Sequence, residues 1–190
     1  MRRGGREVEV LRIGMGPVRA TAARSRLARL APGRAIVLFG FAGGLTTRLR
    51  AGDLVVANSC AGIEEEEEPV ALPHAADVAA LIARAGPPGE VHLAPVVSTP
   101  KVLRGAAERA RLAQYGALAV DMESRWCAPL AERHPFAVVR AVLDVPGREV
   151  LSPATPMATW KAYRSLVWAA RTLRDWSPVP MNDDCKVGDR

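Results

Sequence analysis

Two acidic side chains, Glu123 and Asp144, have the chemistry and the spacing to act together on a sugar. One carboxylate can accept hydrogen bonds from sugar hydroxyls while the other gives a proton to a leaving group. Such a pair suits a reaction whose transition state carries positive charge on a sugar ring. The same residues also fit an ordinary helix cap at Asp121 or Glu123 and a turn at Asp144. The spacing alone leaves both interpretations open.

The segments around these acids are predicted to hold them at strand ends. The apolar run 117–120 meets a polar turn and then a helical pattern, which is typical of a buried strand that opens into a helix. A second apolar run, 136–143, stops at Asp144 before a Pro-Gly turn. Two strands joined through a helix form a right-handed crossover, so we expect parallel neighbours with Glu123 and Asp144 on one rim. Ligands of open α/β sheets bind at that rim.

A strand, a glycine turn and a helix are predicted near the N-terminus, with a strand at 8–13, a turn at Gly14 and Gly16, and a helix at 18–30. A dinucleotide-binding turn has a third glycine where this chain has Arg19, and no ribose-binding acid follows at the expected distance. We therefore expect no such cofactor. The glycines still let backbone N–H groups approach an anion or a ribose, and a simple tight turn is the alternative.

Length and composition predict one domain at 1–178 followed by a flexible tail at 179–190. The net charge of +6 comes from an excess of arginine, which can attract anionic partners. The chain has no zinc-ligand spacing and few aromatic residues to stack on bases, so we do not expect a nucleic acid as its partner.

Cysteine and histidine usage predicts a cytoplasmic protein without a metal or other cofactor. The three cysteines are far apart and form no CxxC motif, which favours reduced thiols. The three histidines show no metal-ligand spacing. No apolar stretch is long enough to span a bilayer. The expected closing helix at 157–176 is rich in Arg and Trp, so peripheral contact with a membrane surface is an alternative to simple packing on the sheet.

Four segments, in order, resemble the nucleoside phosphorylase superfamily, which includes purine nucleoside and uridine phosphorylases and methylthioadenosine/S-adenosylhomocysteine nucleosidases. They are RIGMGPVRATAA at 12–23, GFAGGLTTRLRAGDLVV at 40–56, AVDMES at 119–124 and VVRAVLD at 138–144. The resemblance implies an α/β fold of three layers, α/β/α, with a mixed, largely parallel central sheet, and a dimer or higher oligomer. VSTPKVLR, at 97–104, and the proline-rich segment after residue 144 are most similar to the hopanoid-associated branch, thought to release adenine from adenosylhopane.

The resemblance implies roles for particular residues. In this family a purine leaves a ribose through an oxocarbenium-like transition state. Glu123 would accept hydrogen bonds from the ribose hydroxyls, and Met122 would pack under the sugar. Asp144 would protonate or hydrogen-bond N7 of the purine, with apolar neighbours such as Leu143 disfavouring its charged form. Backbone and wall positions implied in the same way are Ala42, Gly43, Gly14, Gly16, Val102 and Leu103.

Two departures from the family pattern decide between reaction types. Phosphorylases of the family commonly hold phosphate with an arginine and a serine at the positions of Leu38 and Phe41, so hydrolysis is the better prediction. Family nucleosidases position the attacking water with a glutamate from an N-terminal strand unit, whereas 13 residues precede Gly14 here. We expect either a mis-assigned start codon or a shortened paralogue with an exposed sheet edge that invites oligomerisation.

The predicted function is cleavage of the N-glycosidic bond of an adenosine-type nucleoside, with release of adenine. The substrate could carry a 5′ substituent, as in methylthioadenosine or adenosylhopane. The alternatives are a phosphate-dependent phosphorylase and a nucleoside-binding paralogue without catalysis.

Overall fold

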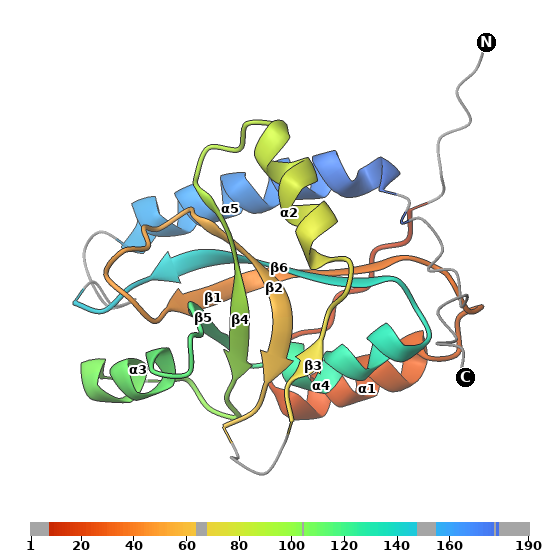
Figure 1. The fold of residues 1–190 in the computed structure, drawn as a ribbon, viewed down its shortest axis with the longest axis horizontal. Coiled ribbons are helices and arrows are strands. Elements are labelled where there is room, and N and C mark those ends of the chain that lie inside the picture. Colours follow the sequence, from red (N-terminus) through yellow and green to blue (C-terminus); the bar gives the residue numbers. More distant parts are fainter. Residues whose placement is uncertain (1–7, 64–67, 104, 148–154, 177, 179–190) are drawn as a thin grey trace, which may run out of the picture.

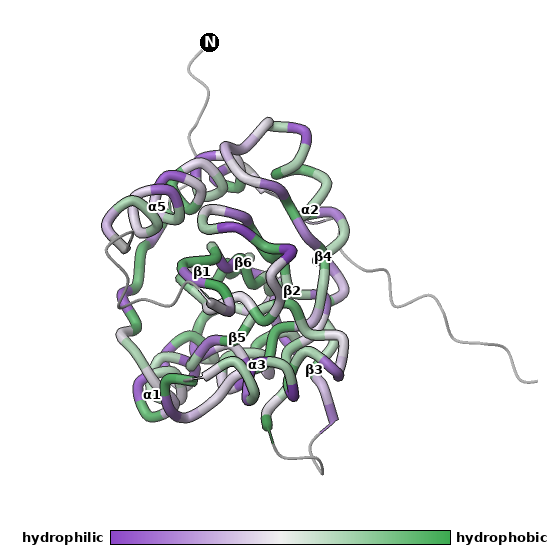
Figure 2. Tube along the Cα trace, turned by 90° about the vertical axis from the view of Figure 1, so that its left-hand side faces the viewer, coloured by the Kyte–Doolittle hydropathy of each residue, from purple (hydrophilic) through white to green (hydrophobic). Residues whose placement is uncertain are grey.

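A mixed sheet separates two layers of helices in the computed structural model, which describes residues 8–63, 68–103, 105–147, 155–176 and 178 (Figure 1). One layer contains α2 (Ala75–Arg84) and α5 (Thr155–Thr172), and the other contains α1 (Pro17–Leu27), α3 (Ala106–Ala113) and α4 (Ser124–Cys127). The turned view separates the same two groups (Figure 2). This arrangement confirms the predicted fold class. The expected tail at 179–190 lies outside the described residues.

Six strands form the sheet, in the order β3-β2-β4-β5-β1-β6. They are β1 (Ile36–Gly44), β2 (Leu54–Ala61), β3 (Val70–Ala71), β4 (Val91–Ser98), β5 (Ala119–Asp121) and β6 (Phe136–Asp144). Because β2 also pairs with β6, five of the strands close into a ring. The closure is reinforced at the start of β2, where the Gly52 N–H donates to the Val142 carbonyl and the Val142 N–H donates to the Asp53 carbonyl.

The prediction that the strands before Glu123 and Asp144 are parallel neighbours is wrong. β1, from an earlier part of the chain, lies between β5 and β6. It pairs parallel with β6 and antiparallel with β5, so β5 and β6 run in opposite directions. The crossover rule assumes that consecutive strands pair, and a strand inserted between them removes that assumption.

The core follows from the composition of the strands. Eight of the nine residues of β6 are buried, because it pairs with β1 and β2 and also packs against α5 and α2. Strands buried in this way carry continuous apolar runs. Against β6 pack the small residues of α5, Ala162, Ser165 and Ala169, which are almost fully buried. The expected helix at 157–176 is therefore α5 and the short 3-10 turn Leu173–Asp175 that follows.

One edge of β1 is open among the described residues. The Ile36 N–H donates to the Pro135 carbonyl. In this parallel pair the backbone N–H and C=O groups of the even-numbered residues of β1 therefore point toward β6. The backbone groups of Val37, Phe39 and Phe41 therefore point the other way, and β5 reaches β1 only at its last two residues. A cavity of about 1070 Å³ lies between this edge and residues 8–15.

The strand predicted at 8–13 is absent from the described structure. Its residues line the far side of the same cavity and make no strand pairing with β1. An apolar, β-branched sequence is not enough to form a strand, because a strand needs a partner for its backbone groups. The helix predicted at 18–30 is present as α1 but ends three residues earlier, at Leu27, and it begins at Pro17, where proline suits the first helical position.

Two of the three cysteines, Cys60 and Cys127, lie among the described residues. Both are free and buried. Burial raises the pKa of the Cys127 thiol to about 11 and raises the pKa of Cys60 still further.

Within the described ranges no helix has the length and apolar character needed to cross a bilayer.

Candidate functional site

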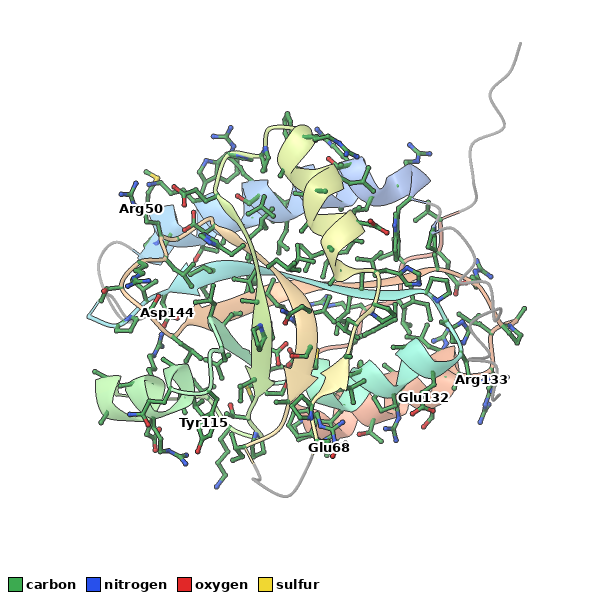
Figure 3. The ribbon with its side chains drawn as sticks, in the orientation of Figure 1. Arg50, Glu68, Tyr115, Glu132, Arg133 and Asp144 are labelled. Carbon is green, nitrogen blue, oxygen red and sulfur yellow. The ribbon has the colours of Figure 1, made fainter. Side chains whose placement is uncertain are left out.

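A cavity of about 430 Å³ lies at the carboxyl end of β1 and β6, next to α3 and the end of β5. Figure 3 shows Asp144 at this end of the sheet, on the side of α3. The cavity is lined by Met15, Phe41, Ala42, Gly43, Thr99, Val102, Leu103, Arg109, Val120, Asp121, Met122, Glu123, Leu143 and Asp144. A volume of several hundred cubic ångströms with largely apolar walls and few polar groups is typical of a small-molecule site.

Seven of the residues expected at a site line this cavity: Asp144, Glu123, Met122, Ala42, Gly43, Val102 and Leu103. The two N-terminal glycines lie beside it. Gly14 lines the larger neighbouring cavity. Gly16 donates its N–H to Oε1 of Glu123 at 2.9 Å. Their roles in binding or catalysis stay predictions.

β1 brings the acids together even though their strands run in opposite directions. Gly43 is paired with Val120 of β5 on one side and with Asp144 of β6 on the other. A Cβ at Gly43 would stand 3.0 Å from Oδ1 of Asp144 and 3.3 Å from an Arg109 nitrogen. The glycine run of the sequence therefore leaves room for a charged pair between three strands.

Asp144 forms a two-point ion pair with Arg109. The Arg109 NH2 group donates to Oδ2 at 2.9 Å and the NH1 group donates to Oδ1 at 3.3 Å. NH1 also donates to the Gly44 carbonyl at 2.9 Å, and both charged side chains are more than nine-tenths buried. The group in direct contact with the Asp144 carboxylate is therefore a guanidinium, and the expectation that apolar neighbours disfavour its charged form stays a prediction.

A second buried ion-pair network lies behind the Glu123 side of the cavity. The Arg140 NH2 group lies 2.5 Å from Oδ2 of Asp121 and 3.5 Å from Oε2 of Glu123. Ser98 and Ser124 donate their hydroxyls to the same Asp121 carboxylate. Asp121 also accepts the backbone N–H groups of Glu123 and Ser124, each at 3.2 Å. The Asp121 carboxylate therefore binds the backbone of the turn that leads into α4, whose N-cap position is Glu123.

Gly40 makes the position of Arg140 possible. A Cβ on Gly40 would lie only 1.9 Å from the NH1 nitrogen of Arg140, closer than any nonbonded contact allows. Gly40 and Arg140 are paired across β1 and β6. The absence of a side chain at Gly40 thus leaves the space that the Arg140 guanidinium occupies.

Glu123 is the acid best placed to meet a ligand. Its side chain is 13% exposed, against 0% for Asp121, and it lines both cavities together with Met15 and Phe41. One oxygen is fixed by the Gly16 N–H and the other lies near Arg140. The turn at the start of α1 and strand β6 therefore orient a single carboxylate at the junction of the two cavities.

The cavity offers little for binding a free anion. Among the described residues that line it, Arg109 is the only cation, and its charge is already compensated by Asp144. Leu38 is buried and Phe41 presents an apolar ring. The described residues also contain no group of three His, Cys, Asp or Glu side chains able to hold a metal ion.

Sequence reasoning missed three groups at the site: Arg109, Arg140 and the Ser98–Asp121–Ser124 cluster. A signal existed for Arg140, because a lone arginine inside the apolar run FAVVRAVLD must be paired when that strand is buried. No comparable signal marks Arg109, which lies on a surface-like Ala/Arg helix that was not predicted.

Comparisons with known proteins agree with this architecture. Residues 2–170 match the Phosphorylase superfamily. No curated protein matches the chain. Among solved structures, the 5′-methylthioadenosine/S-adenosylhomocysteine nucleosidase of Neisseria meningitidis, in complex with methylthio-immucillin-A, is 20% identical with a TM-score of 0.72, over 86% of this chain and 79% of that one.

Two Helicobacter pylori structures are also similar. A 5′-methylthioadenosine/S-adenosylhomocysteine nucleosidase is 17% identical, with a TM-score of 0.71 over 86% of this chain and 78% of that one. Futalosine hydrolase is 17% identical, with a TM-score of 0.65 over 85% and 75%. At such identities the likeness establishes the fold. With the family match over most of the sequence, it follows that the chain belongs to the phosphorylase superfamily, a group of nucleoside-cleaving enzymes.

Proposed function

We propose that this protein hydrolyses the N-glycosidic bond of an adenosine-type nucleoside and releases adenine. The observation that carries the proposal is the 430 Å³ cavity in which Glu123 and Asp144 both take part, between apolar walls. A nucleoside has a polar sugar and a flat base. A site for it can therefore use one acid at each end and an apolar slot between them.

The sugar is proposed to lie at Glu123. Its carboxylate accepts the ribose hydroxyls, and its negative charge stabilises the positive charge that develops on the ring as the bond breaks. Arg140 and the Gly16 N–H hold this carboxylate in place. Met122 forms part of the same wall and packs against the sugar.

The base is proposed to lie at the Arg109–Asp144 pair, between Val102, Leu103 and Leu143. Adenine offers an acceptor at N7 next to a donor at its 6-amino group. A carboxylate held by a guanidinium presents the matching acceptor and donor. As the C1′–N9 bond breaks, its electron pair leaves with the purine, and the positive charge of Arg109 offsets the negative charge that develops there.

Water is proposed as the nucleophile. The C1′–N9 bond breaks, a water oxygen bonds to C1′, and the proton lost by that water ends on the base. Leu38 and Phe41 supply no anion-binding group, which supports water over phosphate. The family resemblance further suggests a 5′-substituted substrate, methylthioadenosine or a longer hopanoid-type nucleoside, and the assay below separates them.

The test is adenine release from adenosine, methylthioadenosine and a 5′-alkyl adenosine, each with and without phosphate. We expect release that does not depend on phosphate. Asp144→Asn and Glu123→Gln should each lower kcat/KM by about 100-fold or more, since each removes a charge that acts in the transition state. Asp77→Asn, an exposed acid on α2, is the matched control and should leave the rate unchanged.

Circular dichroism and nucleoside binding separate a folding defect from a catalytic one, because Asp144→Asn leaves Arg109 without its charged partner. A folded variant that binds nucleoside and keeps full turnover would overturn the assignment of Asp144. Ribose 1-phosphate as the product would show that phosphate is the nucleophile. Binding without turnover in the unmodified chain would favour a non-catalytic paralogue.

A further inference from the structure

The outer face of α5 carries large apolar side chains that a helix in this position normally buries. Met157, Trp160, Tyr163 and Trp168 are 60%, 55%, 54% and 41% exposed, and the rings of Trp160 and Tyr163 stack at 6.3 Å. The inner face, which packs on β6, holds the small residues Ala162, Ser165 and Ala169 instead. The amphipathic order of an ordinary surface helix is therefore reversed.

The same face is uniformly basic. Lys161, Arg164 and Arg171 are exposed, as is Arg174 in the following turn. The helix contains no acidic residue from Thr155 to Thr172. Positions 157, 160, 161, 164, 168 and 171 follow helical spacing, so the aromatic and basic side chains alternate along one stripe. We call this stripe, from Met157 to Arg171, the α5 face.

We infer that the α5 face docks the protein on the surface of an anionic phospholipid bilayer. Trp and Tyr rings prefer the interface between lipid headgroups and acyl chains. Lys and Arg extend their apolar stems beside them and place their charges at the anionic headgroups. A helix that lies in the plane of the membrane combines these two groups, and α5 lies at the outside of the fold, away from α1 (Figures 1 and 2).

A second copy of the chain is a poor occupant for this surface. In a two-fold dimer the same patch meets itself, so the cations of the α5 face would oppose each other with no acid on the helix to compensate. Single-stranded nucleic acid is bound mainly in grooves, whereas the α5 face is the convex side of one helix. A broad, negatively charged surface fits its shape and its charge.

The docking surface lies close to the candidate site. Ala170, Leu173 and Trp176, at the end of the same helix and its following turn, line the larger cavity. That cavity shares Glu123 and Phe41 with the site. A protein docked through α5 therefore holds near the bilayer a cavity that adjoins its site. The inference does not depend on the proposed reaction.

The experiment is co-sedimentation of the full chain with vesicles of phosphatidylcholine, with and without phosphatidylglycerol, followed by tryptophan fluorescence. We expect binding and a blue shift only with the anionic lipid, and release in high salt. Lys161→Gln/Arg164→Gln/Arg171→Gln should weaken binding by roughly 100-fold, since each basic residue near an anionic surface contributes about fivefold. Trp160→Ser/Trp168→Ser should abolish the blue shift.

The matched control removes three exposed arginines on other elements, in Arg29→Gln/Arg111→Gln/Arg133→Gln. Figure 3 shows Arg133 at the end of the molecule opposite Asp144. An equal loss of binding in this variant would mean that net charge alone, and not the α5 face, attracts the vesicles. Equal binding to both kinds of vesicle, tighter binding to oligothymidylate, or a dimer in light scattering that the tryptophan variant dissociates would each overturn the inference.

Discussion

Replacing Gly40 by alanine should destabilise the fold strongly through a single contact. The new Cβ would lie 1.9 Å from the NH1 nitrogen of Arg140, which is itself 2% exposed. Arg140 cannot move away without leaving the fully buried Asp121 carboxylate unpaired. Breaking a buried ion pair costs about 3–5 kcal/mol. A glycine-to-alanine change in an accommodating strand would instead stabilise by about 0.4–1 kcal/mol, so the two outcomes differ in sign.

The assay is urea and thermal unfolding of Gly40→Ala, Arg140→Lys and the double variant. In a chain of this size each kcal/mol lowers Tm by about 2–4 °C, so the single alanine variant should melt roughly 10 °C lower. Lysine keeps the charge near Asp121 but has no second terminal nitrogen, which removes the atom that meets the new methyl group. The double variant should therefore be more stable than the sum of the single changes predicts.

Strict additivity of the two changes would refute the reasoning, because it would mean that the methyl group and the guanidinium do not compete for space. A Gly40→Ala protein as stable as the parent chain would refute it more directly. A weakened Arg140 should also release Glu123, so loss of nucleoside binding in the same variant is a second readout at the site.

Three further predictions use other parts of the molecule. Burial raises the pKa of Cys127 from 9.0 to about 11 and also raises the pKa of Cys60, so these thiols ionise first in the unfolded chain. The free energy of unfolding should therefore be unaffected below pH 9 and should fall as the pH rises toward 11. Urea titrations at a series of pH values would measure this change. Arg109→Met should cost about 3–5 kcal/mol in urea unfolding, because it leaves Asp144 buried without its partner, while Arg109→Lys keeps part of the stability. Leu103→Ala should raise KM about fivefold with kcat nearly unchanged, because it removes roughly 1 kcal/mol of apolar contact with the base, and steady-state kinetics would test this.

The sequence was most informative where local pattern and burial agree. The apolar run at 136–143 became strand β6 at 136–144, and the run at 117–120 overlaps strand β5 at 119–121. Two acids were recognised from strand ends alone, and the structure brings Glu123 and Asp144 to one cavity. Periodicity and turn residues are local properties, so they are readable in one chain.

What the sequence could not give depends on distant partners. β1 precedes β5 by 75 residues, from Gly44 to Ala119, yet it separates β5 from β6, and no local pattern encodes that insertion. The ion-pair partner of Asp144 is Arg109 of α3, 35 residues earlier in the chain. Residues 8–13 form no strand although they lie across a cavity from the open edge of β1, and no local pattern encodes that separation. Pairing and charge compensation are therefore properties of the whole fold.

The open edge of β1 makes the folded chain a template for addition of a strand from another molecule. Within the part of the chain that the structure describes, Val37, Phe39 and Phe41 have no backbone partners on this edge, so an extended apolar segment that meets them gains hydrogen bonds and buries surface together. Soluble protein should therefore be lost to aggregation faster as its concentration rises, and fastest when unfolded chains are present. A short apolar peptide added in excess would occupy the edge and keep the folded protein in solution.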